Sequence, residues 1–536
     1  MIKGKIDPLG RYSVKAWGVS LLLLSQLAQA IGEAPEISFD VEAFNVVGQL
    51  PFSDEKVAGI LAPFKGSHSG LEGLQAAGDA LESELRQQGY AFFEVSLPPQ
   101  TLTGGVVSLE VLQQRIGSIV VQGQKYFDEN NAKASVPTLV EGLPPNTREI
   151  SRSVKLANEN PSKSIKVSFK GGQRPGEVDA TIKVVDQREW NIFTSLSNTG
   201  NNLTGKWRNT IGFQHNNLFN RDHNYTMAAT YAPGEGSVVS QYSLNYRLPL
   251  YTIASSVDFY FSTSDVDTGI VNLNSAAGGS AEFGSLLGGG QVSGVRFNHS
   301  FLNIGKYRHS FSLALEDKFV DNNTLISRLG VQLNDRRRST PLTLSYDMGY
   351  QYSKNSWSAQ LRYAKNVELN NHNDQSDYDT APGTPDVDWD LWRTSIYQDV
   401  AFGPGWIWRL QLSAQRANQV LIAGEKYGIG GVASVRGYEE RISSGDNAQL
   451  VRNELWLKPV GAVRPVLFYD WGESTNLRSS ATGLKTKQRL AGFGLGFRYS
   501  LAQRLSAQLD VARARNSINR VDSGDVRAHF NLFARF

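Results

Sequence analysis

Hydrophobic and polar residues alternate one by one through most of the chain, from about Glu189 to Phe536. The last segment is the clearest, because every second residue is apolar: Val526, Ala528, Phe530, Leu532, Ala534 and Phe536. Successive side chains of a strand point to opposite faces, so this pattern predicts strands with one apolar and one polar face. Lipid cannot form hydrogen bonds with the backbone N–H and C=O groups of such strands. In a membrane the strands must therefore pair with one another in a closed barrel. We expect residues 188–536 to form a transmembrane β-barrel of about 16 antiparallel strands.

The pattern is different in the first 187 residues. Basic residues up to Lys15, an apolar run over 17–27 and Ala28-Gln29-Ala30 predict a signal peptide over residues 1–30, with an uncleaved anchor as the alternative. Residues 31–113 then follow a strand, helix, helix, strand, strand pattern, with apolar residues of the second helix spaced 3, 4, 3 and 4 apart. Residues 114–187 repeat that order, which predicts two small α+β domains before the barrel.

Two short motifs lie in the C-terminal part of the barrel. Val435-Arg436-Gly437-Tyr438 places a single cation among small residues, in a long loop over about 418–447. In Phe468-x-Asp470-x-Gly472 the three named side chains share one strand face, with Asp470 as the natural partner of Arg436. Glycines at 492, 494 and 496 share a strand face and leave room for a closely packed backbone. If each residue is considered alone, the alternative interpretation is that Arg436 is an ordinary turn arginine and Asp470 an ordinary strand-end carboxylate.

Together, these motifs and the strand ending at Phe536 resemble the two-partner secretion transporters, the haemolysin and filamentous-haemagglutinin exporters. The resemblance implies an outer-membrane barrel of a Gram-negative bacterium with two periplasmic polypeptide-transport-associated (POTRA) domains. It implies that the 418–447 loop folds into the barrel lumen and that Arg436 meets Asp470 on the inner wall. It further implies export of a large, unfolded partner protein of the haemolysin, adhesin or toxin type.

Three kinds of partner follow from this interpretation. The secreted protein would add a strand to an exposed sheet edge in each small domain. The residues expected to bind it are Tyr90, Phe92, Phe93, Val95, Ile165, Val167 and Phe169. Outer-membrane lipid would surround the barrel, and the barrel assembly machinery would bind Phe536 as a C-terminal assembly signal.

Composition and motifs argue against other functions. The net charge of +3 gives no reason to expect nucleic acid, and the absence of cysteine excludes thiolate chemistry. The seven histidines show no metal-ligand spacing, a P-loop-like stretch at 200–207 lacks its hydroxyl, and no nucleophile–base pair is found. We therefore expect that the protein is not an enzyme and that it binds no metal or cofactor.

Other membrane-barrel functions are the remaining alternatives. An insertase of the same superfamily normally carries more POTRA domains, a diffusion porin needs none, and a gated uptake receptor needs a long plug domain. The segment 31–36 is too short for a plug helix and linker, which predicts a resting pore filled only by the Arg436 loop. The polar segment 370–390 is expected to be extracellular.

Overall fold

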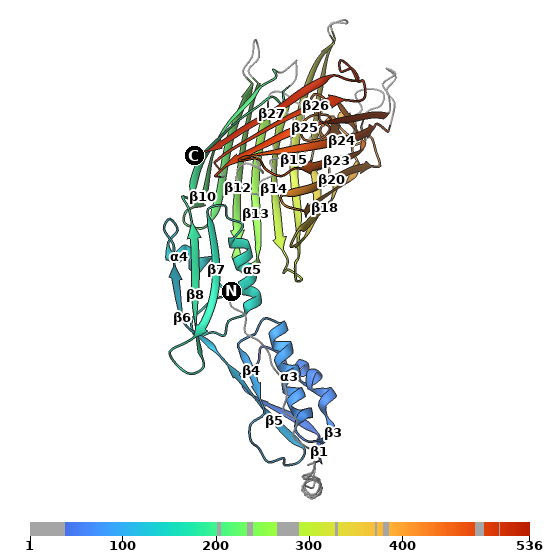
Figure 1. The fold of residues 1–536 in the computed structure, drawn as a ribbon. Helices are drawn as coiled ribbons and strands as arrows, with labels where there is room; N and C mark the ends of the chain where they lie inside the picture. The colour runs from blue at the N-terminus through green and yellow to red at the C-terminus, as the bar shows by residue number, and fades with distance from the viewer. Residues whose placement is uncertain are drawn as a thin grey trace, which may run out of the picture. The chain divides into compact units, whose positions relative to one another are not determined.

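The computed structural model describes residues 38–200, 205–232, 239–264, 289–326, 331–369, 372–378, 385–477, 487–502 and 504–536. The predicted signal peptide and the segment 31–36 lie outside the described residues. The chain divides into two compact units, residues 1–114 and 115–536, and each is described by itself (Figure 1).

The first unit contains a three-stranded sheet covered by two helices. Its elements are β1 (Ser38–Val41), β2 (Ala43–Val47), α2 (Asp54–Leu61), η1 (Ala62–Phe64), β3 (Gly66–Ser69), α3 (Glu72–Gln87), β4 (Phe93–Ser96) and β5 (Val106–Gln113). β5 is central, with β2 parallel on one side and β4 antiparallel on the other, so β4 is an edge strand. Ser53 accepts a hydrogen bond from the Lys56 backbone and starts α2. Leu81 and Leu85 of α3 pack on Phe93 and Leu109 of the sheet.

β4 is shorter than the sequence pattern predicts, and the expectation that Tyr90 and Phe92 belong to an edge strand is wrong. Gly89 adopts a φ of 95°, and the Tyr90 N–H donates to Leu85 O at 2.8 Å, which closes the C-terminus of α3. The Phe93 N–H then donates to Tyr90 O at 3.3 Å. This turn occupies the residues before Phe93, so β4 begins there, and only the Phe92 carbonyl extends the pairing by accepting from the Gln114 N–H at 3.0 Å.

Residues 115–186 form a second α+β unit of the same element order. It comprises β6 (Arg115–Gln122), α4 (Glu129–Ala134), α5 (Thr147–Ala157), β7 (Lys163–Gly171) and β8 (Glu177–Asp186). The sheet order is β6-β8-β7, with β6 parallel and β7 antiparallel to β8, so β7 is an edge strand. Ile150 and Ala157 of α5 pack against Ile165, Ala180 and Ile182 of the sheet.

The remaining strands form a closed antiparallel barrel. Its strands are β9 (Trp190–Ser197), β10 (Arg208–Leu218), β11 (His223–Ala232), β12 (Val239–Leu250), β13 (Ser255–Ser264), β14 (Gly289–Ser300), β15 (Tyr307–Ile326), β16 (Val331–Ser339), β17 (Pro341–Tyr352), β18 (Asn355–Asn366), β19 (Asp390–Phe402), β20 (Trp406–Ala417), β23 (Asn447–Trp456), β24 (Val463–Thr475), β25 (Lys487–Leu501), β26 (Leu505–Ala514) and β27 (Val526–Arg535). β16 and β17 both pair with the long β15 and occupy one place in the wall, so the described barrel has 16 strands. The predicted fold class is confirmed.

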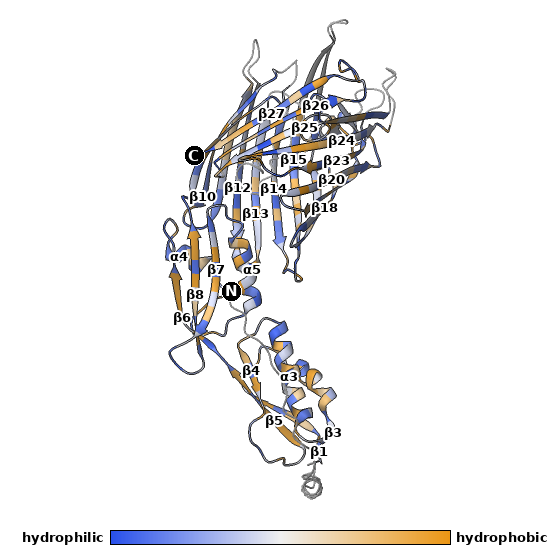
Figure 2. Cartoon of the chain, viewed as in Figure 1, coloured by the Kyte–Doolittle hydropathy of each residue, from blue (hydrophilic) through white to orange (hydrophobic). Residues whose placement is uncertain are grey.

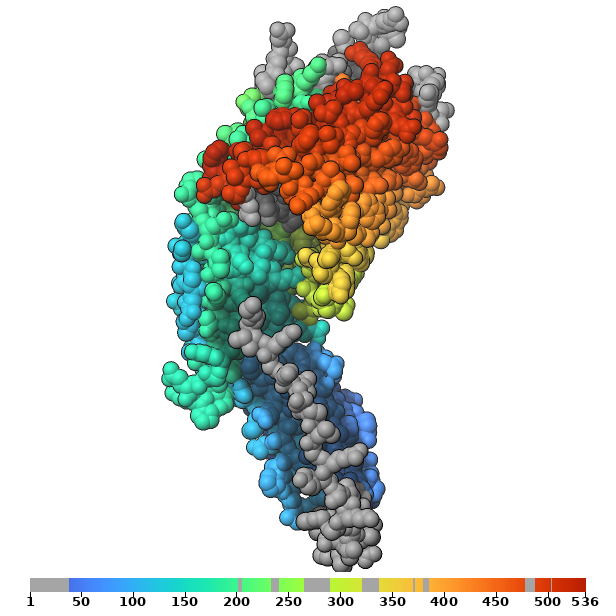
Figure 3. Space-filling model, viewed as in Figure 1, coloured from blue at the N-terminus to red at the C-terminus, as the bar shows by residue number. Residues whose placement is uncertain are grey.

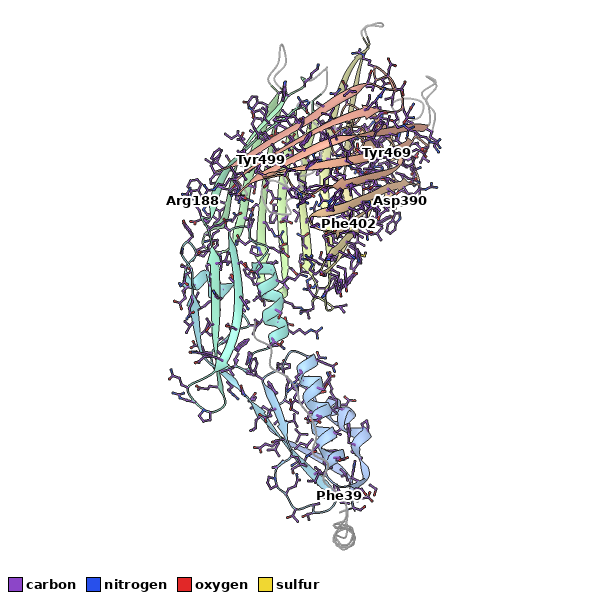
Figure 4. All side chains as sticks on the ribbon, in the orientation of Figure 1. Phe39, Arg188, Asp390, Phe402, Tyr469 and Tyr499 are labelled. Atoms are coloured by element: carbon purple, nitrogen blue, oxygen red, sulfur yellow. The ribbon has the colours of Figure 1, made fainter. Side chains whose placement is uncertain are left out.

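The alternating pattern separates the two faces of the wall. On β24, Leu467 and Tyr469 are 46% and 42% exposed on the outside, whereas Phe468 and Asp470 are buried inside. Figure 2 shows the resulting alternation of hydrophobic and hydrophilic residues along the C-terminal strands, and Figure 4 labels Tyr469 on this wall. The space-filling view shows these strands as a continuous outer surface (Figure 3).

The segment between β18 and β19 is not simply a polar extracellular loop. In its described parts, α7 (Gln375–Tyr378) and the approach to β19 fold back, and Tyr378 and Trp389 are both fully buried. They pack with Leu391, Leu421 and Ile422. The two aromatic side chains stabilise this fold by removing apolar surface from water, a contribution that the acidic composition of the segment conceals.

A buried polar cluster joins the second α+β unit to the barrel. Lys163 of β7 donates to Asp222 at 2.5 Å, to Asn131 at 2.6 Å and to Ser135 at 2.7 Å. Asp222, in the turn between β10 and β11, also accepts from Tyr251 of η2 (Tyr251–Ile253) at 2.5 Å. Burial lowers the pKa of Lys163, and Asp222 only partly offsets this. A satisfied buried network of this kind fixes the orientation of the elements that contribute to it.

Candidate functional site: the lumen loop

The loop between β20 and β23 packs inside the barrel. It begins with η3 (Ala423–Glu425), continues through a short hairpin of β21 (Tyr427–Ile429) and β22 (Ser443–Gly445), and carries the arginine motif in its tip. Ile429, Val435 and Tyr438 of the loop are fully buried and pack on Leu450 and Leu490 of the wall. The tip therefore lies against the inner face of the C-terminal strands.

Arg436 is the most densely bonded side chain of the tip. Its Nε and Nη2 donate to the two carboxylate oxygens of Asp470 at 2.6 and 2.7 Å, and its backbone N–H donates to Asp470 at 3.1 Å. Nη1 lies 2.7 Å from Glu454 and 3.4 Å from Asp510. The guanidinium also lies 3.5 Å from the centre of the Phe468 ring. This two-point pairing matches the planar fork of arginine, which lysine does not provide.

The charges around Arg436 balance. Two further arginines complete the cluster: Arg498 lies 2.5 Å from Asp510, and Arg452 lies 3.6 Å from Glu454. Three guanidinium groups thus meet the three carboxylates. Burial opposes the charge of Arg436, but Asp470 and the other two carboxylates outweigh burial and raise its pKa, so Arg436 remains charged.

Glycines in both motifs and on the neighbouring strand β25 make this close approach sterically feasible. A Cβ at Gly492 would lie 2.0 Å from Arg436 O, and one at Gly472 would lie 2.9 Å from Val435. Gly437 adopts a φ of 99° and donates its N–H to His529 at 3.0 Å. The hydroxyl of Tyr438 donates to Ala491 O at 3.0 Å. Each motif residue therefore has a geometric reason for its identity.

Sequence reasoning gave Glu454, Asp510 and His529 no part in this site. All three face inward on β23, β26 and β27 and are buried. Strand alternation could have placed Asp510 inside, because its neighbours Leu509 and Val511 are 38% and 40% exposed on the outside. The sequence contains no signal that relates any of the three to Arg436, since each lies on a different strand.

The two predicted docking edges differ in their backbone groups. On β4, the outward N–H of Val95 donates to the Glu82 carboxylate of α3 at 3.2 Å, and that of Phe93 is used by Tyr90 O. On β7, the side-chain amide of Asn158 bonds both outward backbone groups of Ile165. It accepts the Ile165 N–H at 2.7 Å and donates to the Ile165 carbonyl at 3.1 Å. Val167 has the same outward parity as Ile165, and no partner is found for its outward groups among the described residues.

A groove of about 600 Å³ follows the β7 edge. It lies between α5 and β7 and is lined by Ile150, Val154, Ile165, Val167 and Phe169, with Lys155 and Asn158 among its polar residues. An edge strand beside an apolar groove can pair with the backbone of an extended peptide and take up alternate side chains.

Phe536 ends the seam that closes the barrel. Its side chain is 75% exposed, and its backbone N–H donates to Ile192 O at 2.8 Å. β27 and β9 pair over only five residues.

Within the described part of the chain, no group of three or more histidine or acidic side chains is arranged to hold a metal ion.

Comparison with known proteins identifies the family. The family model described as "Haemolysin secretion/activation protein ShlB/FhaC/HecB" matches residues 176–499, more than half of the chain. The chain belongs to this family. A second family model, "POTRA domain, ShlB-type", matches residues 39–113. The chain is thus an outer-membrane transporter of two-partner secretion with periplasmic POTRA domains, as the motifs implied.

Individual relatives support the same assignment. The heme/hemopexin transporter protein HuxB of Haemophilus influenzae (strain 86-028NP) is 22% identical, over 96% of this chain and 97% of its own length. The outer membrane transporter CdiB of Escherichia coli O6:K15:H31 is 22% identical, over 84% of this chain and 76% of its own length. The solved structure of CdiB from Escherichia coli superposes with a TM-score of 0.73 at 19% identity, covering 95% of this chain and 92% of that one. The family match favours a transporter over the insertase alternative.

Proposed function

We propose that this transporter captures its secreted partner as an extended strand on the β7 edge of the second POTRA domain, which spans residues 114–187 in our division of the chain. The partner then enters the barrel, and the loop held by Arg436 must leave the lumen before the partner can pass. The protein performs no chemical reaction on the partner. Residues 1–30 serve as the signal peptide, outer-membrane lipid surrounds the barrel, and the assembly machinery inserts it.

The observation that carries this proposal is the difference between the two edges. An added strand needs outward N–H and C=O groups without partners, together with a surface for its side chains. The β7 edge offers Val167 beside the groove of about 600 Å³. On β4, by contrast, the Glu82 carboxylate already accepts from Val95. We therefore assign backbone docking to Val167, with Ile165 and Phe169 lining the groove for the partner's side chains, rather than to Phe93 and Val95.

Peptide binding to the purified full-length protein in detergent tests this proposal. The probe is a fluorescent peptide of alternating threonine and valine, about six residues long like an ordinary strand. Its control has the same sequence with alternate amides N-methylated, which blocks backbone pairing on one edge. Fluorescence anisotropy should show binding of the first peptide and not of the second.

Proline substitutions locate the edge. Val167→Pro removes one donor and should weaken binding about two- to tenfold relative to Val167→Ala. Val95→Pro is the matched change on β4 and should have no effect. Weakening by Val95→Pro alone, or equal binding of both peptides, would refute docking on β7.

A further inference from the structure

Glu425 lies at the base of the lumen loop, on a different part of the barrel wall from Arg436. Its side chain is 2% exposed, and its carboxylate lies 2.6 Å from the Lys318 ammonium on β15 and 3.4 Å from the Arg393 guanidinium on β19. This is an ion triad formed between a loop residue and two strands.

The backbone of Glu425 is held as well. Its carbonyl accepts hydrogen bonds from Arg393 at 2.8 Å and from Gln415 at 3.0 Å. Lys318 also lies 3.1 Å from Glu316, whose carboxylate accepts from the Tyr260 hydroxyl at 2.6 Å. Each charge in this cluster therefore has a partner, and the geometry fixes both the side chain and the main chain of the loop at this point.

The two clusters are independent. Arg436 contacts β23, β24 and β26, whereas Glu425 contacts β15, β19 and β20. In the barrel order, β17 to β20 and β23 separate β15 from β24. Among the described residues, no side chain contributes to both clusters. The loop is thus attached to the wall through two sets of side chains, which meet on the neighbouring strands β20 and β23, and β21 lies between the two attachments in the chain.

We propose that Glu425 is a second anchor of the lumen loop, a positioning residue that holds the loop base against β15 and β19. Release of Arg436 alone then frees the tip but leaves the base attached. The loop clears the lumen only when both anchors are released. Because the clusters share no side chain, the free-energy effects of the two losses should add, so the opening frequency in the double variant should rise by about the product of the two single increases.

The local charges allow this proposal to be tested without unfolding the barrel. When Glu425 is neutral, Lys318 keeps Glu316 as its partner, so no buried cation is left alone. Arg393 keeps a hydrogen bond from its Nε to Gln415. Glu425→Gln preserves the shape of the side chain and removes only its charge.

The experiment is single-channel recording in planar bilayers on purified full-length protein. The variants are Glu425→Gln, Glu425→Ala, Arg436→Ala and the double variant Glu425→Ala/Arg436→Ala. The matched control is Glu368→Ala, which removes an exposed carboxylate. A difference in gel mobility between unheated and heated samples establishes that each barrel is folded, so that a changed conductance is not due to unfolding.

Removal of a hydrogen-bonded charge should make openings about ten- to hundredfold more frequent in Glu425→Ala, with a smaller increase in Glu425→Gln. The double variant should reach a larger open conductance than either single variant, and Glu368→Ala should behave like the unsubstituted protein. Openings of Glu425→Ala that match those of the unsubstituted protein, or a double variant no more conductive than Arg436→Ala, would overturn the proposal. If Glu425→Ala fails to fold, Glu425→Gln decides by the same criteria.

Discussion

Replacement of Arg436 by alanine should release the tip of the lumen loop while the barrel stays intact. Arg436→Ala leaves three buried carboxylates facing only Arg452 and Arg498, a net charge of −1 where the native cluster is neutral. Loss of one partner from a buried ion pair costs about 3 to 5 kcal/mol. The ratio of released to docked loop should therefore rise by about two to four orders of magnitude.

The conservative replacements should release the loop tip less than Arg436→Ala does. Asp470→Asn keeps one acceptor for Arg436, which retains Glu454 at 2.7 Å, so we expect a smaller release. Arg436→Lys keeps the charge but cannot form the two-point pair with Asp470, and it should fall between Asp470→Asn and Arg436→Ala.

Thiol labelling measures this release directly. The chain has no cysteine, so Ser434→Cys introduces a single probe at a buried position of the loop tip. A bulky water-soluble maleimide should label it slowly in the otherwise unchanged protein and much faster with Arg436→Ala. Arg489→Ala is the control, since that arginine is 61% exposed. Equal labelling rates with and without Arg436 would refute the claim that this side chain holds the tip.

Three further outcomes are expected. Burial raises the pKa of the loop residue Glu440 to about 7, so its stabilisation of the docked loop is complete below about pH 4.5 and is lost as the pH rises through 7. Because the reactive thiolate also increases with pH, the rise in Ser434→Cys labelling from pH 6 to pH 8 should be larger than the rise in Ser434→Cys/Glu440→Gln. Gly492→Ala, whose methyl group would lie 2.0 Å from Arg436 O, should speed labelling, whereas Gly349→Ala on β17, with its nearest atom at 3.5 Å, should not. Lys163→Met should broaden spin-label distances between the second POTRA domain and the barrel, because Asp222 loses its cation, and Lys163→Met/Asp222→Asn should broaden them less.

The barrel was predictable because its signal is repeated on every strand. Alternation decides which side chains face lipid, and the length of the segment limits the strand number. The α+β domains were predictable in order but not in their ends. Tyr90 and Phe92 looked like strand residues because they are aromatic, but the hydrogen bonds that close α3 take up this segment.

The candidate site was predictable only where two residues belong to recognisable motifs. Arg436 and Asp470 could be paired from the resemblance, and the glycine at 492 indicated where backbone approaches the wall. Glu425 and Lys318 are more than a hundred residues apart and lie in no motif, so their contact depends on how the whole barrel closes. The same holds for Glu82, which occupies a docking edge that looks open in the sequence.

The most direct test of the central claim compares the proteins released by the source bacterium with and without this gene. We expect one large protein to disappear from the medium and cell surface when the gene is deleted. It should return with the native gene and return much less with Arg436→Ala. The other outer-membrane barrels should be present at unchanged levels throughout. Loss of many outer-membrane barrels would instead indicate an insertase, and an unchanged set of released proteins would contradict export of a partner.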